Sequence, residues 1–330
     1  MASQRDVKNR IGSVKNIQKI TRAMEMVAAA RLRRAEQRIA ALRPYADALR
    51  RMTRQAALDA GAEASRLELL NERETVSTVG LLLVTGDRGL AGGFNSQVIR
   101  AGVRAGTELD EQGLGTVWYA TGRRGVSSLT FRGREVSGAY MGFTDKPSYA
   151  DARDIAGELI EAYTTGTVDR VELVYNAYVS PLTQEVTHET LLPLSSATIA
   201  GEEEREGAGE AGGETARGAG TAGSAGTVGA TGMGAGSGSR KPGPRALVEY
   251  EPDAEEILRR LVPDYVETSI YRALVESAAG FFGAQMTAMR NASENAGEII
   301  TDLTLEMNRA RQAEITQEIM EVVAGAEGLS

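Results

Sequence analysis

The sequence has no cysteine and a single histidine, His188. Without cysteine the chain cannot form disulfides, thiolate zinc sites or thiol redox switches. One histidine supplies little for general-base catalysis or metal binding, and aromatic residues make up only 5% of the chain, which is low for a compact enzyme. No run reaches about 18 apolar residues, so we expect no membrane-spanning helix. These absences leave few catalytic, redox or metal-dependent functions open.

A long helical pattern is present at each end of the chain. Residues 5–58 and 264–326 each predict one helix. At about 1.5 Å per residue, these helices would be rods of roughly 80 and 95 Å. Rods of that length exceed the width of an ordinary domain, so we expect neither to be buried in the core of its own chain. Antiparallel pairing of the two rods, with a domain between them, is the simplest arrangement.

The spacing of apolar residues predicts which faces of the two helices meet. The regular part of the first stripe consists of Leu32, Ala35, Ile39, Leu42, Ala46 and Leu49, and its less regular part of Val7, Ile11, Val14, Ile17, Ile20, Met24 and Val27. The stripe of the last helix consists of Met289, Ala292, Ala296, Ile299, Leu303, Glu306, Ala310, Ala313, Gln317 and Met320. Pro44 is expected to kink or loosen the first helix, and Pro263 to end a separate short helix around residues 254–262.

The two helical segments carry opposite charge. Residues 1–54 contain fourteen Lys/Arg and four Asp/Glu, whereas residues 264–326 contain four Lys/Arg and ten Asp/Glu. Exposed ion pairs between them should contribute less than about 1 kcal/mol each. Three interpretations stay open: a solvated coiled coil with complementary faces, a basic surface that faces an acidic partner, and nucleic-acid binding. The last is the least favoured, because aromatic residues are not interleaved with the basic ones.

Between the helical ends, strand-like and helix-like segments alternate. Strands are predicted at 78–85, 116–121, 170–179 and 186–192, and helices at 95–111 and 148–165. This order predicts a parallel, Rossmann-like sheet of modest size. The fold class is therefore α/β, with a long antiparallel coiled coil of the terminal helices and a Rossmann-like domain.

The composition divides the chain into four units. We expect an N-terminal coiled-coil helix at 1–58, an α/β domain at 75–195, an insert at 201–245 and a C-terminal coiled-coil helix at 254–330. The insert contains fifteen glycines and eight alanines and almost no bulky apolar side chain. Such a segment cannot bury enough surface to offset its ordering entropy, so it is expected to be disordered.

A glycine-rich turn, Gly86–Asn95, follows the first predicted strand and opens a helix, where a phosphate-binding loop would lie. Its spacing is not G-x-G-x-x-G, and no Gly-Lys-Ser/Thr is present. A tightly packed βα turn is therefore favoured over nucleotide binding. His188 lies in a run of alternating polarity and is expected to be an ordinary strand residue.

The C-terminal end of the last helix is apolar on all sides. Between Ile319 and Leu329 the charged residues are Glu321 and Glu327. A helix of this kind is normally enclosed by protein. We therefore expect an apolar sleeve around four tip residues, Ile319, Met320, Val322 and Val323, with simple fraying as the alternative.

Three separated motifs resemble the γ subunit of rotary, proton-translocating ATP synthases. The family's N-terminal helix is similar to residues 11–31, IGSVKNIQKITRAMEMVAAAR, and its central turn to residues 87–95, DRGLAGGFN. Its C-terminal motif is similar to residues 310–326, ARQAEITQEIMEVVAGA. The resemblance covers nearly the whole chain except the glycine-rich insert. It implies a central rotor shaft inside a hexamer of α and β subunits, with the α/β domain as a foot that meets the ε subunit and the membrane c-ring.

The resemblance also implies roles for individual residues. Contact with a catch loop of the β subunit maps onto Arg311, Gln312 and Thr316, and contact with the acidic lever region of β onto Met24, Arg31, Arg33 and Arg34. Catalysis in that family takes place on β with MgATP, ADP and phosphate, so no active site, cofactor or metal is implied for this chain. The family usually has a further catch-loop arginine where this chain has Gln285, and the Phe281-Phe282 pair nearby is unusual for the family. No catch contact is therefore assigned to position 285. By analogy, the location is the cytoplasmic face of the bacterial cell membrane, as a peripheral membrane protein.

Two other functions stay open. The first is a free-standing coiled-coil scaffold with a nucleotide-sensing Rossmann-like domain, which requires ATP to bind at the Gly86–Asn95 turn. The second is an enzyme that uses the α/β domain. It requires a nucleophile or a base that the sequence does not show.

Overall fold

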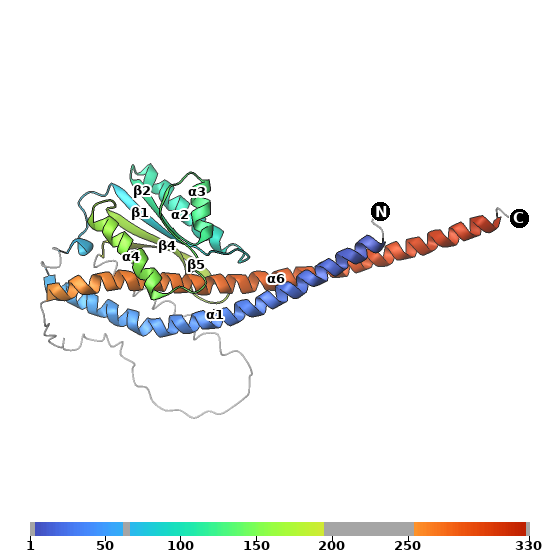
Figure 1. Ribbon diagram of the computed structural model, residues 1–330, viewed down its shortest axis with the longest axis horizontal. Helices are drawn as coiled ribbons and strands as arrows, with labels where there is room; N and C mark the ends of the chain where they lie inside the picture. Colours follow the sequence, from blue (N-terminus) through green and yellow to red (C-terminus); the bar gives the residue numbers. More distant parts are fainter. Residues whose placement is uncertain (1–3, 62–66, 195–253, 328–330) are drawn as a thin grey trace, which may run out of the picture.

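Two long helices dominate the computed structural model, which describes residues 4–61, 67–194 and 254–327. Helix α1 spans Gln4–Ala60 and helix α6 spans Ala254–Glu327. They lie side by side, and α6 continues well beyond the N-terminal end of α1 (Figure 1). A compact α/β domain covers one end of the pair. The expected insert at 201–245 lies outside the described residues, and the four-unit division of the chain stays a prediction.

The paired helices run antiparallel, as expected. Gln18 of α1 donates a hydrogen bond from Nε2 to the Ser293 carbonyl oxygen of α6 at 3.2 Å. Seven residues further along α1, Glu25 accepts from Arg290 Nε at 2.9 Å, closer to the start of α6. The mixed α/β fold class with a coiled coil of the terminal helices is therefore confirmed.

The predicted seam of α1 holds for Val7, Ile11 and Val14 but is wrong from Ile17 to Val27. Ile17, Ile20 and Val27 are 53–59% exposed, whereas Thr21 and Ala28 are buried. The observed seam is a strict heptad pattern, in which one row is Val7, Val14, Thr21, Ala28, Ala35, Leu42, Leu49 and Ala56 and the other is Ile11, Gln18, Glu25, Leu32, Ile39, Ala46, Thr53 and Ala60. The prediction followed apolar side chains, but three seam positions between Ile17 and Val27 are polar and are satisfied by hydrogen bonds. The Thr21 hydroxyl donates to the Gln18 carbonyl oxygen at 3.1 Å, and the other two bond to α6.

A similar shift corrects the predicted seam of α6. Met289 and Ala296 are buried as predicted, but Ile299 is 47% exposed and Glu306 is exposed as well. The half-buried residues at these levels are Ile300 and Met307. The spacing between seam rows is therefore four then three residues rather than three then four. Residues 311–320 are all exposed, because they lie beyond the start of α1.

Pro263 does not end a helix. It lies inside α6, which begins ten residues earlier than the predicted rod, and Pro44 likewise lies inside α1. The expectation that the rods stay outside the core of their own chain is wrong for this part of α6. Leu258, Val262 and Val266 are at most 1% exposed and belong to the main core cluster. Burial of that apolar surface offsets the cost of proline inside a helix, which is about 3 kcal/mol.

The α/β domain is built on a five-stranded sheet in the order β3-β2-β1-β4-β5. Its elements are β1 Thr78–Val84, α2 Phe94–Glu111, β2 Gly115–Thr121, α3 Arg123–Phe131, β3 Val136–Tyr140, α4 Tyr149–Thr164, β4 Arg170–Tyr178 and β5 Gln184–Leu192, preceded by the short 3-10 helix η2 Glu68–Leu70. Strands β1 to β4 are parallel, but β5 pairs antiparallel to β4. The prediction of a parallel sheet holds for β1 to β4 but not at this edge, because a short hairpin joins β4 directly to β5. The prediction also missed α3 and β3.

The sheet separates two hydrophobic layers. On one face, α2 and α3 pack over Leu81, Leu83 and Trp118. On the other face, α4, α6 and the last turns of α1 pack over Leu82 and Leu173. The first part of α6 therefore belongs to the domain, while its remaining length forms the shaft. Within the described ranges, no helix combines the length and low polarity that a bilayer crossing requires.

Candidate partner-binding surfaces

The free end of α6 carries one group of predicted contact residues. Arg311, Gln312 and Thr316 are all exposed there. The Thr316 hydroxyl donates to the Gln312 carbonyl oxygen at 2.8 Å, so it is used within the helix, while the Arg311 and Gln312 side chains face solvent. The structure therefore brings these three residues together on a helix segment without α1 beside it.

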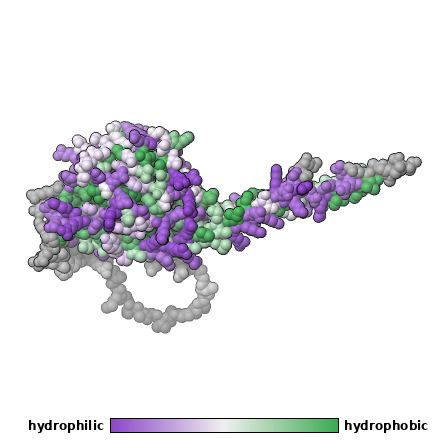
Figure 2. Space-filling model, in the orientation of Figure 1, coloured by the Kyte–Doolittle hydropathy of each residue, from purple (hydrophilic) through white to green (hydrophobic). Residues whose placement is uncertain are grey.

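The predicted bearing residues lie on the same free segment. Ile319, Met320 and Val322 are 57%, 64% and 73% exposed. The side chain of Val323 lies outside the described residues. Two further apolar side chains, Leu305 and Ile315, are also exposed and were not singled out from the sequence. Figure 2 shows such apolar side chains near the tip of the shaft. Exposed apolar residues gathered on one narrow rod are typical of a surface covered by a partner.

A second apolar surface lies on α1, to one side of the seam. Ile17, Ile20 and Val27 are exposed, and Met24 is half-buried between them. Their spacing of three, four and three residues places them on one helix face. Sequence reasoning had assigned these residues to the seam. The signal that could have separated the two faces was the seven-residue repeat of the buried positions.

The three predicted basic contact residues differ in their surroundings, because two are exposed and one is bonded to the α/β domain. Arg33 and Arg34 are exposed. Arg31 is half-buried, and its Nη1 lies 3.4 Å from Asp145 Oδ2 in the loop between β3 and α4. Its guanidinium carbon also lies 5.7 Å from the centre of the Phe282 ring on α6. Arg31 thus ties the shaft to the α/β domain.

Two side chains of the Gly86–Asn95 turn, Asn95 and Asp87, are held by hydrogen bonds within the turn and to the neighbouring loops. The Asn95 side chain accepts from Gly86 N at 2.8 Å and donates to the Arg88 carbonyl oxygen at 3.0 Å. Asp87 accepts from the Thr144 hydroxyl at 2.8 Å and from the backbone N–H groups of Arg123, Gly142 and Thr144. Burial alone would raise the pKa of Asp87, but these hydrogen bonds outweigh it and hold the pKa below its usual value.

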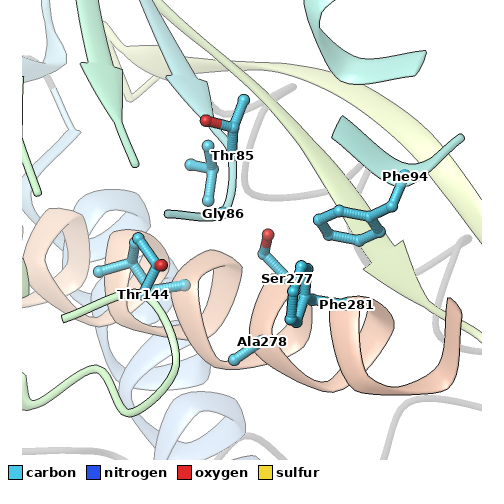
Figure 3. A pocket seen from close by; sticks show the side chains of 9 residues that line it. Thr85, Gly86, Phe94, Thr144, Ser277, Ala278 and Phe281 are labelled. Carbon is cyan, nitrogen blue, oxygen red and sulfur yellow. The ribbon is translucent and has the colours of Figure 1, made fainter. Parts of the chain in front are cut away.

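A small cavity lies beside this turn, at the carboxyl end of β1 (Figure 3). Open Rossmann-like sheets bind nucleotides at this edge. Here α6 closes the edge, because Phe281 packs edge-to-face against Phe94 with ring centres 5.7 Å apart. The remaining cavity volume is about 10 Å³. That space holds at most about one water molecule, which is far too little for a nucleotide.

His188 lies on β5 and pairs with a carboxylate on β4. Its Nε2 is 2.6 Å from Glu172 Oε2, and Arg170 Nε is 2.7 Å from the other oxygen of Glu172. Burial by itself raises the pKa of Glu172, but the hydrogen bond to His188 and the charge of Arg170 reverse this and lower it. Across the described ranges, no group of three or more His, Asp or Glu side chains is arranged to hold a metal ion.

These features define a class of protein in which a long, exposed two-helix shaft stands on a small α/β domain. The family model described as ATP synthase matches residues 3–329. The chain is 42% identical to the ATP synthase gamma chain of Rubrobacter xylanophilus over 330 residues, which cover all of this chain and 99% of the relative. It is 40% identical to the gamma chain of Nostoc sp., with both chains fully covered. The chain therefore belongs to the ATP synthase gamma chain family.

Solved structures show the same fold. The central stalk of the Tetrahymena thermophila mitochondrial ATP synthase matches with a TM-score of 0.53 and 22% identity, over 83% of this chain and 99% of that one. A chain of the Euglena gracilis mitochondrial enzyme matches with a TM-score of 0.60 and 14% identity, over 99% and 94%. Family membership and fold together make this chain the central rotor shaft of an ATP synthase. That role fits a non-catalytic subunit of a membrane-associated complex.

Proposed function

We propose that this chain transmits torque between the membrane c-ring and a catalytic hexamer of α and β subunits, and so couples proton flow to ATP synthesis. The observation that carries the proposal is the build of α6. One continuous helix of 74 residues begins in the core of the α/β domain and ends as an exposed rod. A rotation of the domain is therefore transmitted to the tip through one unbroken helix, α6.

The α/β domain serves in this proposal as the foot of the rotor. It meets the ε subunit and the c-ring, and ATP is made and hydrolysed on β. The complex sits at the cytoplasmic face of the bacterial cell membrane, and this chain reaches the membrane through the c-ring alone. Gene-family resemblance and the absence of room for a nucleotide beside Phe281 support the assignment of catalysis to other subunits.

Two surfaces of the shaft engage β. The polar group Arg311, Gln312 and Thr316 contacts a catch loop, and Met24 with the basic residues Arg31, Arg33 and Arg34 contacts the acidic lever region. The exposed apolar face of Ile17, Ile20 and Val27 extends that second contact. Because the shaft is not symmetric about its axis, each β subunit meets a different face at any moment and is biased toward a different nucleotide affinity.

The tip residues Ile319, Met320, Val322 and Val323 turn inside an apolar sleeve. Apolar contacts are not directional, so they allow rotation while keeping the tip centred. The charged residues just before the tip residues, such as Glu314 and Glu318, lie on a segment whose side chains are exposed. The sleeve is therefore expected to enclose the last turns rather than the whole free segment.

A double substitution tests the catch contact. Arg311→Ala with Gln312→Ala should lower ATP hydrolysis by the assembled complex about tenfold or more, because a lost hydrogen bond to a charged group costs about 1.5–3 kcal/mol and about 1.4 kcal/mol is a factor of ten in rate. The complex should still assemble, since neither residue packs against α1. Arg309→Ala is the matched control, an exposed arginine on the same helix outside the predicted contact. Unchanged turnover in the double variant would count against the catch assignment.

Isolation from native membranes tests the assembly itself. An affinity tag on this chain should recover α, β and ε subunits in fixed stoichiometry. Calorimetry on the same chain tests the rival nucleotide-sensing scaffold, for which micromolar ATP binding is required. The packing of Phe281 into the carboxyl edge of the sheet speaks against such binding.

Deletion of residues 204–240 should leave assembly and turnover nearly unchanged, because the insert is proposed to take no part in coupling.

A further inference from the structure

The shaft leaves the α/β domain at a short neck, defined by residues 31–36 of α1 and 276–282 of α6. Toward the base of α6, Leu258 and Leu274 are buried in the domain core. Toward the tip, α1 and α6 are joined to each other, as by Glu25 with Arg290. Any torque that passes between the domain and the two-helix shaft must therefore cross the neck.

One anchor at the neck is centred on Asp145. Its Oδ2 lies 3.4 Å from Nη1 of Arg31 on α1 and 3.4 Å from Nη1 of Arg88 in the turn after β1. The carboxylate is 27% exposed, so it is partly shielded from solvent. One acidic side chain of the domain thus holds the shaft and the β1 turn together.

A second anchor is centred on Tyr178, the last residue of β4. Its hydroxyl donates to Glu36 Oε1 on α1 at 2.5 Å. Its backbone N–H donates to Glu276 Oε2 on α6 at 3.4 Å. Burial, and then the hydrogen bond to Glu36, raise the pKa of Tyr178, so the hydroxyl keeps its proton and stays a donor at neutral pH. The end of one central strand is therefore bonded to both helices of the shaft.

The two anchors hold α1 from different sides. Arg31 and Glu36 are five residues apart, which at 3.6 residues per turn places them about 140° apart around the helix axis. A rotation of α1 relative to the domain in either direction therefore stretches one of the two contacts. Apolar packing at the neck, such as Phe281 on Phe94, resists separation but has little directional preference.

We propose that Asp145 and Tyr178 are positioning residues that lock the rotational angle of the shaft relative to the α/β domain. Through Arg31 and Glu36 they form the torsional coupling of the rotor. This inference rests on the proposed function, because a locked angle matters only if torque passes along the shaft. It assigns that coupling to two polar anchors, in addition to the apolar core below them.

Angular fluctuations of the domain in the assembled complex provide the test. The hexamer is fixed to a surface, and a particle is attached to a cysteine introduced at Ser127, an exposed residue of α3 in a chain with no other cysteine. Turnover is stopped, and the variance of the angle gives the torsional stiffness. The anchors act in parallel and their contributions should add, so Asp145→Asn or Tyr178→Phe should each raise the variance at least about 1.5-fold, and the pair more.

Matched controls separate this effect from general loss of structure. Asp110→Asn removes a comparable ion pair, 2.8 Å from Arg134, that lies within the α/β domain and does not touch the shaft. It should leave the variance unchanged. Asp145→Glu keeps the charge and should restore the original stiffness. Tyr178→Phe removes one oxygen atom, so it keeps the proposal testable if the double variant does not assemble.

The possible results are distinct. A larger variance in the anchor variants, with no change in Asp110→Asn and normal unloaded hydrolysis, supports the coupling role. Equal variance in all variants overturns it, while ATP-driven rotation of the particle in the unmodified complex would leave the rotor function intact. If the particle does not rotate with ATP in the unmodified complex, the proposed function fails and this inference fails with it.

Discussion

Phe281 should be one of the most costly residues of the chain to truncate. Its side chain is 4% exposed and packs edge-to-face against two rings, Phe94 and Phe282, each with centres 5.7 Å apart. Replacement of a buried phenylalanine by alanine costs about 3–5 kcal/mol. The site also borders an existing cavity of about 10 Å³, so the space left behind would join it instead of collapsing. We therefore expect Phe281→Ala to lower the free energy of unfolding by about 4 kcal/mol.

Urea unfolding of the full chain measures this loss. Trp118 is the single tryptophan, is 2% exposed on β2, and reports the α/β domain by fluorescence. Phe131→Ala is the matched control, since Phe131 is 91% exposed. The control should change the free energy of unfolding by less than about 0.5 kcal/mol. A loss below about 1 kcal/mol for Phe281→Ala, or equal losses in the two variants, would refute the claim that α6 seals the carboxyl edge of the sheet.

Three further predictions concern the domain and the shaft. Gly122 has a φ of 80°, and a Cβ there would lie 2.2 Å from the Thr85 carbonyl oxygen, so Gly122→Ala should lower the urea midpoint more than Gly113→Ala, which has open space around it. Hydrogen bonds from Ser77 hold the pKa of Asp169 below 3.8, so the stability that Asp169 provides is present above that pH and is lost as pH falls through its lower folded-state value. Asp169→Asn should therefore lower the free energy of unfolding by about 2 kcal/mol at pH 7, and by progressively less below about pH 4. Urea unfolding at several pH values measures this difference. A loss that does not change with pH would contradict the prediction. Ile20→Asp should leave unfolding of the free chain nearly unchanged but reduce recovery of α and β subunits in an affinity isolation, and equal recovery would contradict a partner contact at that face.

The terminal helices and the core strands could be predicted because their patterns are long and periodic. Helix α1 repeats its buried positions over almost its whole length, and β1 is a continuous apolar run after Thr78. The three motifs located the family. The prediction of the α1 seam failed where polar and apolar residues compete. Thr21 is buried there while Ile20 is exposed. Thr21 bonds to the Gln18 carbonyl oxygen of its own helix, and Gln18 and Glu25 bond to α6, so the polar seam is satisfied in a way that hydrophobicity alone does not predict.

Other differences arise from tertiary packing. Pro263 stops a helix only if nothing else holds it, and its neighbours Val262 and Val266 are buried in the domain core. Strand β3 and helix α3 are short, and Gly125 and Leu129 are the buried residues of α3, so neither element has a strong period. The role of Arg31 at the neck depends on Asp145, more than a hundred residues away. No local pattern connects residues at that separation.

The polar seam near the free end of the shaft sets how far the tip protrudes. If α1 slid along α6 by one heptad, about 10 Å, apolar seam residues would still meet apolar ones. Gln18 would lose the Ser293 carbonyl and Glu25 would lose Arg290, which leaves polar groups without partners in the seam. A coiled coil with a wholly apolar seam could pair in several axial registers, and the length of α6 that protrudes beyond α1 would differ between them. These hydrogen bonds fix one axial register, so the same length of α6 protrudes beyond α1 in every copy of the chain.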